Sequence, residues 1–257
     1  MDLVDAHLHL DDPVFDADRD DVVRRARATG VTSMLTVGTN LATSRAAVAL
    51  AERYPEVYAA VAVHPHEAAG LTDDILGELR ALAGHRKVVA IGETGLDFAR
   101  GDPPRDVQET AFRRHIGLSA ETGLPLAIHC RDAFGAVFGI LLEDGSSPGV
   151  IMHAFSGTVE NARTCLERGY AVSLAGPVTF RDAHLAVEVA RMVPLHAMLV
   201  ETDAPVLAPV PFRGRRNEPA FLPYTVERIA AVKAMPVDDV AAATTANARH
   251  VFRMDLT

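Results

Sequence analysis

The amino-acid sequence predicts a closed (β/α)₈ barrel of parallel strands. Short apolar runs rich in β-branched residues alternate with longer amphipathic segments, and this alternation indicates a parallel sheet covered by helices. The chain has 257 residues, which is an ordinary length for one barrel domain. An open, doubly wound sheet is the second choice, because the Gly-rich phosphate-binding fingerprint of many such sheets does not occur in the sequence.

The expected strands begin close to the N-terminus and recur along the chain. Each is a short apolar run of the length that a buried strand needs, followed by turn or polar residues. In chain order these runs cover residues 3–7, 32–37, 57–63, 88–92, 125–129, 149–152, 171–174 and 197–201.

Amphipathic segments fill the intervals between the expected strands. The first, residues 20–29, carries Val22, Val23 and Ala26 on one side and arginines on the other, which is the periodicity of a surface helix. Further helices are expected at 41–53, 73–83, 105–122, 133–143, 159–168 and 182–193, and two more at 221–234 and 238–252. Several of them are followed by a glycine that suits a helix C-cap, namely Gly30, Gly84, Gly123 and Gly169.

The composition fits one folded domain over residues 1–257, without linker, repeat or low-complexity segment. Apolar residues make up 49% of the chain, enough for a large core, while the apolar runs are too short to cross a membrane. We expect no signal peptide. The two cysteines, Cys130 and Cys165, are interpreted as core residues of a reduced, cytoplasmic protein. The one long irregular stretch, 204–219, is rich in Pro and Arg and is a candidate functional loop.

Polar residues collect where the expected strands end. In Asp5-Ala6-His7-Leu8-His9-Leu10, the two histidines stand at i and i+2 of a strand and therefore point to the same side. The carboxyl ends of barrel strands open on one face, where barrel enzymes carry their active sites. Other strand ends bring further imidazoles and carboxylates to this face: His64, His66, Glu93, His129, His153 and Asp203.

These residue types predict a metal centre. Neutral imidazole and carboxylate are ligands of Zn, Mn and Fe, and carboxylate also of Mg. Four histidines and two carboxylates suffice for two ions that share a bridging carboxylate. Two divalent ions would leave the site locally positive in a chain of formal net charge −9, so an anionic substrate is attracted there and not by a wide basic surface. A lone strand-end histidine is more often structural, and we assign that role to the histidines on helices and linkers: His85, His115, His184, His196 and His250.

Seven motifs in chain order resemble the TatD family of metal-dependent deoxyribonucleases. The resemblance covers essentially the whole chain, and the order of the motifs makes it specific. Two small departures are Ala154, where the family often has Cys, and Phe98, where it often has Tyr. The motifs are Asp5-Ala6-His7-Leu8-His9, Val63-His64-Pro65-His66, Gly92-Glu93-Thr94-Gly95-Leu96-Asp97, Ile128-His129-Cys130-Arg131-Asp132-Ala133, His153-Ala154-Phe155-Ser156-Gly157, Glu201-Thr202-Asp203-Ala204-Pro205 and Arg213-Gly214-Arg215-Arg216-Asn217-Glu218-Pro219.

The resemblance implies an amidohydrolase-like barrel that hydrolyses phosphodiesters of DNA, including exonuclease action on single strands or strand ends. It implies two divalent ions (Mg, Mn or Zn), and DNA as the partner, with neither a membrane nor an obligate protein partner. The implied metal ligands are His7, His9, Glu93, His129, His153 and Asp203.

The hypothesis for catalysis is in-line attack of a metal-activated water on phosphorus. Glu93 would bridge the ions, Asp203 would hold the water and accept its proton, and His64 would contact a phosphate oxygen or the leaving group. The remaining candidates are His66 and Arg213 as substrate contacts, Asp97 and Glu201 as residues that orient ligands or cap loops, and Arg215 and Arg216 as phosphate contacts or solvated loop residues.

Three alternatives stay open. The first is an amidohydrolase-type enzyme for amides, lactones or phosphotriesters, although many of these use a carbamylated lysine as bridge and this chain has only Lys87 and Lys233, neither at a suitable strand end. A second is an ester hydrolase of D-aminoacyl-tRNA. The third belongs to another class, a non-catalytic metal-holding or partner-binding barrel, and nothing in the chain resembles the docking tail that such a protein would use.

Overall fold

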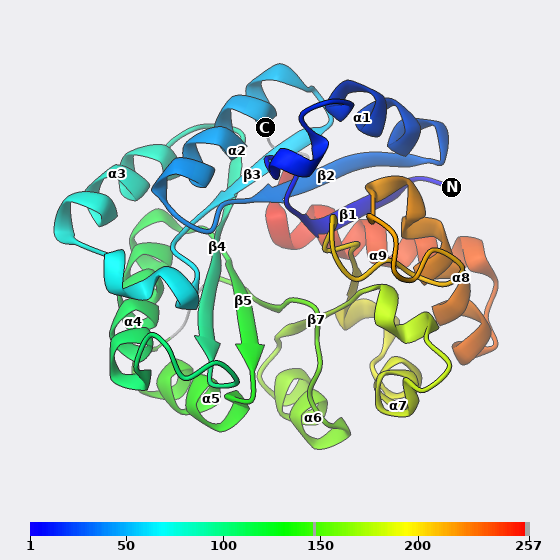
Figure 1. The fold of residues 1–257 in the computed structure, drawn as a ribbon. Helices are drawn as coiled ribbons and strands as arrows, with labels where there is room; N and C mark the ends of the chain where they lie inside the picture. The colour runs from blue at the N-terminus through cyan, green and yellow to red at the C-terminus, as the bar shows by residue number, and fades with distance from the viewer. Residues whose placement is uncertain (146–147, 255–257) are drawn as a thin grey trace. The chain divides into compact units, whose positions relative to one another are not determined.

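The computed structural model describes residues 1–145 and 148–254, in which strands and helices alternate along the chain (Figure 1). The strands follow one another in chain order. They are β1 (Leu3–Leu8), β2 (Val31–Val37), β3 (Val57–Val61), β4 (Val88–Asp97), β5 (Leu126–Arg131), β6 (Val150–Met152), β7 (Ala171–Leu174) and β8 (Met198–Val200).

The helices lie where the amphipathic pattern predicts them, with ends shifted by at most two residues. They are α1 (Arg19–Ala28), α2 (Leu41–Arg53), α3 (Asp73–Ala83), α4 (Arg105–Thr122), α5 (Phe134–Glu143), α6 (Val159–Glu167), α7 (His184–Met192), α8 (Leu222–Lys233) and α9 (Val237–Phe252). Short 3₁₀ turns lie between them, η1 (Pro13–Phe15), η2 (Pro65–Gly70), η3 (Gly176–Thr179), η4 (Leu195–Ala197) and η5 (Pro219–Phe221). None of the helices in the described ranges is both long and apolar enough to cross a membrane.

The described part of the chain divides into two compact units. The first unit comprises residues 1–36 and 154–254. Within it β1 pairs in parallel with β2, and β7 with β8. The first strand also lies against the last, β8, and α9 packs on both of them. This adjacency of first and last strands is what a closed barrel requires.

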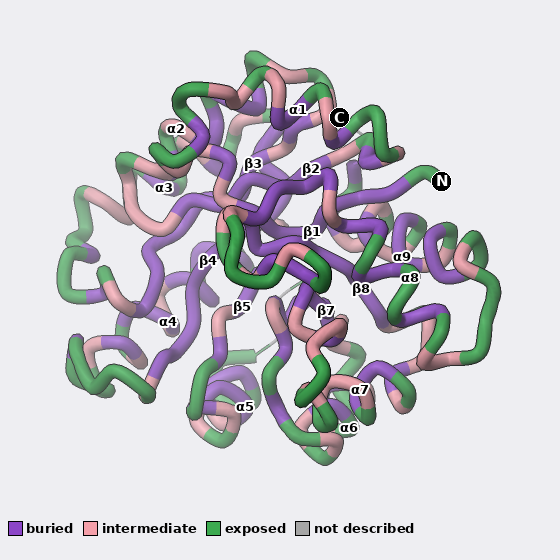
Figure 2. The backbone as a smooth tube through the Cα atoms, turned by 45° about the vertical axis from the view of Figure 1, so that its right-hand side comes forward, coloured by how far each residue is buried: buried purple, intermediate pink, exposed green. Residues whose placement is uncertain are grey.

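The second unit comprises residues 37–145 and 148–153. Strands β3, β4, β5 and β6 pair in parallel in that order, and α4 packs on β4. In both units the strands are largely buried, whereas exposed residues concentrate on helices and loops (Figure 2). Near-continuous apolar runs fit this placement, because parallel strands covered by helices are buried on both faces.

Strand β4 is longer than predicted. It runs to Asp97 instead of ending at residue 92, and its last residues pair with β5 as far as the Asp97–Arg131 step. Gly95 makes this possible: its φ is 132°, and a Cβ atom there would collide with the carbonyl oxygen of His129. Only glycine fits such a close approach with positive φ. Glu93 and Asp97 therefore stand on the strand itself and not on a loop after it.

The predicted glycine C-caps divide into two kinds. Gly123 caps α4 in the left-handed conformation with φ 70°, and Gly30 and Gly169 also have positive φ just after their helices, as a glycine cap requires. Gly84 does not, because its φ is −76°. Gly84 is thus the C-cap of α3 as predicted, but in a conformation that other residues can also adopt.

The buried His115 makes the stability of the fold depend on pH. It is fully buried on α4, its Nδ1–H donates to the carbonyl of Ala111 (2.7 Å), and its Nε2 accepts from the backbone N–H of Val63 (3.0 Å). Burial lowers its pKa to about 4 from 6.5. Between these two values His115 is protonated in the unfolded chain but not in the folded chain. The free energy of unfolding therefore falls as the pH drops from about 6.5 towards 4.

We expect His115 to account for roughly 3 kcal/mol of stability lost between about pH 7 and pH 4. Urea unfolding at several pH values measures this loss. The variant His115→Gln should be less stable at neutral pH but should lose less stability on acidification. His85→Gln serves as the control, since His85 is a partly exposed histidine paired with Glu52. An unchanged acid slope in His115→Gln would contradict this assignment.

Candidate active site

Two histidines and an aspartate meet in the first unit. His7 is buried in β1, and His9 follows directly after the strand, with ring centroids 5.2 Å apart. Their Nε2 atoms lie 4.0 and 3.6 Å from the same oxygen, Oδ1 of Asp203. Asp203 follows β8 and donates its backbone N–H to the carbonyl of His7 (2.9 Å). The i, i+2 spacing thus aims both imidazoles at one carboxylate.

The buried carboxyl of Asp5 links β1 to Thr202, the residue before Asp203. It accepts hydrogen bonds from the backbone N–H of Thr202 (2.9 Å) and from the Thr202 hydroxyl (2.5 Å). A longer bond comes from the N–H of His7 (3.4 Å). Burial raises the pKa of Asp5 to about 7. The role of Asp5 was not predicted, although its place two and four residues before the histidines puts it on the same side of the strand.

Asn217 holds the other side of the Asp203 turn. Its side chain is buried and donates to the carbonyls of Thr202 (2.8 Å) and Val206 (2.7 Å), and its backbone N–H donates to Pro205 (2.9 Å). Asp203 itself has a φ of 54°, a conformation that a non-glycine residue holds only when its surroundings fix it. The contacts of Asn217 supply this constraint.

We expect Asn217→Ala to lower the hydrolysis rate and the metal affinity by roughly 10- to 100-fold each, as for other residues that orient ligands. Steady-state kinetics and a metal titration by calorimetry measure the two effects. The control is Asn161→Ala, which removes the asparagine of the α6 capping box instead. Full rate and full metal affinity in Asn217→Ala would contradict a role in positioning Asp203.

Arg216 anchors the same loop and is only partly exposed. Both of its Nη atoms lie 2.7 Å from the carboxylate of Asp18, and its guanidinium stacks on Phe15. Arg25 binds Asp18 as well and also holds Glu218. Arg216 is therefore fixed by an aspartate far away in sequence, and its role as a phosphate contact stays a prediction.

Glu93 is the centre of the group in the second unit. Its Oε1 lies 2.8 Å from Nδ1 of His129, 2.8 Å from Nε2 of His153 and 3.5 Å from Nε2 of His64. Ligand atoms of His64, Glu93 and His129 all lie within 4.8 Å of one another. Burial raises the pKa of Glu93, but the charges and hydrogen bonds of the histidines outweigh it and hold that pKa well below its usual range. Glu93 is therefore ionised.

Asp97 holds His129 from the opposite side. Its Oδ2 lies 3.1 Å from Nε2 of His129 and 2.8 Å from Nε2 of His66. With Nε2 engaged in this way, Nδ1 of His129 is left to face Glu93. Burial raises the pKa of Asp97, but the hydrogen bonds from both histidines lower it further than burial raises it.

Gln108 fixes the backbone of Asp97, and the sequence analysis missed it. Its side chain accepts from the Asp97 N–H (2.8 Å) and donates to the Asp97 carbonyl (3.0 Å). A glutamine on the buried side of α4 is the feature of the sequence that indicates this role, because a buried amide is nearly always hydrogen-bonded.

Glu201 has a similar backbone role in the first unit. It is fully buried, and it accepts from the N–H of Ala154 (2.6 Å) and the hydroxyl of Ser173 (2.5 Å). Ala154, which follows His153 in the chain, has a φ of 39°. Glu201 thus stabilises a strained turn at the end of β6.

The remaining candidates lie further from these groups. Arg213 is exposed, with its guanidinium 4.2 Å from the ring centroid of Phe180 and 3.4 Å from the carboxylate of Asp182. Arg215 is exposed as well. Lys87, which precedes β4, donates to the carbonyls of Pro55 and Val57. It therefore stands at the opposite end of β4 from Asp97 and has no place as a carbamylated bridge.

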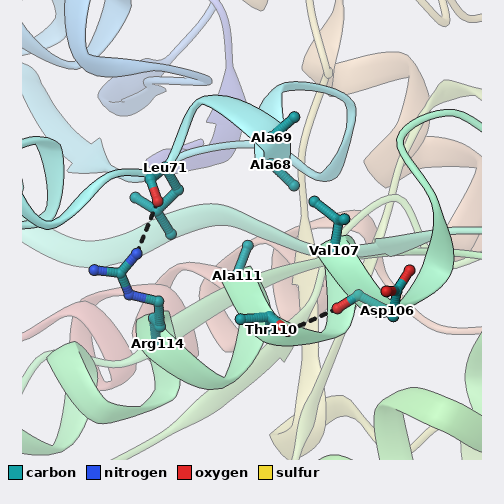
Figure 3. Close-up of a pocket in the computed structure, with 8 residues that line it drawn as sticks. All are labelled: Ala68, Ala69, Leu71, Asp106, Val107, Thr110, Ala111 and Arg114. Carbon is teal, nitrogen blue, oxygen red and sulfur yellow. Dashed lines mark hydrogen bonds between the residues drawn. The ribbon is translucent and has the colours of Figure 1, made fainter.

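A pocket of about 230 Å³ lies between η2 and α4 in the second unit (Figure 3). Arg114 and Thr110 at its edge bond to the backbone of Leu71 and Asp106. None of the candidate metal ligands lines it, so we do not place substrate there. Its lining residues are Ala68, Ala69, Leu71, Asp106, Val107, Thr110, Ala111 and Arg114.

The donor sets of the two units suit divalent cations. The first unit offers His7, His9 and Asp203, and the second offers an ionised Glu93 with its histidine neighbours. Imidazole nitrogen with carboxylate oxygen is a ligand set for Zn or Mn, and the carboxylates also suit Mg. The residues present therefore fit the metal ions that the resemblance implies.

Comparison with known proteins identifies the family. The family model described as TatD related DNase matches residues 4–253. The chain belongs to this family. The TatD relatives include the uncharacterized metal-dependent hydrolase YabD of Bacillus subtilis, 42% identical over 98% of this chain and 100% of its own length. The 3′-5′ ssDNA/RNA exonuclease TatD of Salmonella typhimurium is 39% identical over 98% of this chain and 99% of its own length.

A solved structure agrees with the fold of the chain. YJJV, a TatD homologue of Escherichia coli, matches with a TM-score of 0.93 and 29% identity, over 98% of each chain. The predicted (β/α)₈ barrel and the predicted TatD family are thereby confirmed, and the chain is a hydrolase of that family. The individual roles assigned to the site residues stay predictions.

Proposed function

We propose that this TatD-family hydrolase is a metal-dependent exonuclease that cleaves phosphodiester bonds at the 3′ end of single-stranded DNA or RNA. The observation that carries the proposal is the pair of ligand groups, His7–His9–Asp203 and Glu93–His129–His153, in a chain 39% identical to a relative named for this activity. We propose further that residues 1–257 act as one domain and that the protein works in the cytoplasm without an obligate protein partner.

Both ligand groups are proposed to serve one catalytic centre. In a (β/α)₈ barrel, residues at the carboxyl ends of different strands share one face. The six candidates stand in the carboxyl-terminal half of a strand or just after a strand, with Glu93 four residues before the end of β4. His7, His9 and Asp203 would hold one divalent ion, His129 and His153 the other, and Glu93 both. When bound, such ions lower the pKa of water and stabilise charge on the phosphoryl oxygens. Mg, Mn and Zn are all compatible with these donors.

The other roles in the reaction are assigned to individual side chains. Asp203 accepts the proton of the attacking water at its carboxylate while the bond from phosphorus to the leaving sugar oxygen breaks. His64 is the side chain that would contact a phosphate oxygen or the leaving group, and burial lowers the pKa of its imidazole. Asp97 keeps the ring of His129 in the orientation in which Nδ1 faces Glu93. His66 and Arg213 are the further substrate contacts.

The proposal is tested with short oligonucleotides labelled at the 5′ end, in single-stranded DNA, single-stranded RNA and blunt duplex form. We expect stepwise shortening from the 3′ end of single strands, loss of activity with chelator, and protection by a blocked 3′ end. Glu93→Gln, purified in the same way, controls for contaminating nucleases. Turnover of amides, lactones or D-aminoacyl-tRNA with nucleic acid left intact would overturn the proposal, as would metal binding without turnover of any of these substrates.

A further inference from the structure

An aromatic cluster stands on the surface of the first unit, made of Phe212, Phe221 and Tyr224. The rings of Phe212 and Phe221 stack in parallel, with centroids 3.9 Å apart and an angle of 4°. Tyr224 meets Phe212 edge-on at 5.2 Å. The cluster is not part of the deep core, since both phenylalanines are half-buried and Tyr224 is 37% exposed.

Exposed arginines flank the aromatic cluster. Arg215 follows Phe212 in a turn closed by a hydrogen bond from its own N–H to the Phe212 carbonyl (2.9 Å). The guanidinium of Arg213 lies over the ring of Phe180, and its side chain is 56% exposed. Its Nη1 lies 3.4 Å from the carboxylate of Asp182. Cationic and aromatic side chains thus alternate on a chain whose formal net charge is −9.

The segment that carries most of these residues also carries the candidate catalytic aspartate. Phe212, Arg213 and Arg215 lie on the loop between β8 and α8, and Asp203 stands near the start of the same loop. Tyr224 lies in the first turn of α8, and Phe180 follows η3 after β7. Loops after barrel strands and the helix starts that follow them surround the active face. The cluster and its arginines therefore stand on the rim of the proposed site.

The loop is held in place and does not need to order itself around a ligand. Val210 donates its N–H to the Thr179 hydroxyl (2.8 Å). Arg216 is fastened to Asp18, and Asn217 to Thr202. A surface that is ordered in advance loses less conformational entropy when it binds.

We propose that the aromatic cluster, with Arg213 and Arg215, binds the single-stranded nucleic acid next to the bond being cut. A base would stack on the ring of Tyr224, the phenylalanines would support that ring, and the guanidinium groups would contact the neighbouring phosphates. Aromatic faces with flanking arginines bind single strands with little base preference, because every base offers a π-face. This inference rests on the proposed nuclease function and names the part of the surface that would hold the strand.

The test compares matched variants on substrates of different length. We expect Tyr224→Ala to raise KM for a single-stranded oligonucleotide by roughly tenfold, with kcat little changed. Its effect should be small on a p-nitrophenyl ester of a single nucleotide, which has no neighbouring base. Tyr224→Phe should restore the low KM. Met235→Ala is the control, since Met235 is equally exposed but lies just past the other end of α8.

Salt dependence tests the arginines. We expect Arg215→Ala to reduce the slope of log KM against log salt by about one, the effect of losing one phosphate contact. Arg24→Ala, which removes an exposed arginine of α1, should leave the slope as it is. An oligonucleotide KM that is the same in Tyr224→Ala and wild-type enzyme would overturn the inference while leaving the nuclease function standing.

Binding measurements separate this inference from the nuclease proposal. Fluorescence polarisation of a labelled single strand is followed with Glu93→Gln alone and combined with Tyr224→Ala. Weaker binding in the double variant supports the aromatic cluster as the binding surface even if the wild-type protein cuts no DNA or RNA. Equal binding, or a shift in oligomeric state caused by Tyr224→Ala without any change in binding, contradicts it.

Discussion

Glu93→Gln should lower the rate of phosphodiester hydrolysis by about 1,000-fold or more. The substitution keeps the shape of the side chain but removes the charge that both ions would share, and metal-ion stabilisation of the transition state amounts to several kcal/mol. Glu93 is buried, and one of its oxygens already lies within 2.8 Å of His129 and of His153. A neutral amide at this place leaves the histidines without a carboxylate between them.

The measurement is kcat on a labelled single strand, together with the metal content of the purified variant. Glu121→Gln is the matched control, since it neutralises a glutamate that is half-exposed and paired with Arg80 on the surface. Circular dichroism checks that both variants are folded. A Glu93→Gln enzyme with most of the wild-type rate would remove Glu93 from the centre.

Asp203→Asn should lower kcat by roughly 100- to 10,000-fold, the range for loss of a general base. Asparagine is a suitable probe because the backbone of Asp203 has a φ of 54°, and asparagine tolerates this left-handed conformation better than other side chains. The oxygen near His7 and His9 is retained, but the amide cannot accept the proton of water at neutral pH. Substrate binding should therefore suffer less than the chemical step.

A pH–rate profile tests the assignment of Asp203. The wild-type profile of kcat should fall on the acid side as the base becomes protonated, and this limb should be missing from the residual activity of Asp203→Asn. The control is Asp16→Asn, which changes an exposed aspartate paired with Arg19. A variant with the same acid limb and the same kcat as the wild type would show that the base is another group.

Sequence periodicity was sufficient to predict the elements of the barrel. The apolar runs place β7 at its observed bounds, and the amphipathic segments do the same for α2, α3 and α4. Burial on both faces explains this success, because it leaves a parallel strand as an uninterrupted apolar run. Strand β4 is the exception, since Gly92 and Glu93 look like a strand end. The close approach of Gly95 to β5, which lets the strand continue, depends on a neighbour that the local sequence does not reveal.

The same limit applies to the candidate site. The strand-end pattern indicates the imidazoles and carboxylates, since a barrel brings the ends of its strands to one face. The partners that hold them come from distant parts of the chain: Asp5 and Thr202 are 197 positions apart, and Asp18 and Arg216 are 198. A single sequence does not show such pairings. The anchoring of Arg216 on Asp18 and the hydrogen bonds of Asp5 therefore depend on the fold and not on the local sequence.

Four imidazoles and two carboxylates of this chain are proposed to hold a pair of divalent ions. The decisive measurement is the metal content of the wild-type protein after reloading with Mn or Zn, compared with that of Glu93→Gln by elemental analysis. We expect two ions per wild-type chain, fewer in Glu93→Gln, and nuclease activity that rises with the second ion. A chelated wild-type protein that contains no divalent metal and yet cuts single strands at the full rate would contradict this proposal.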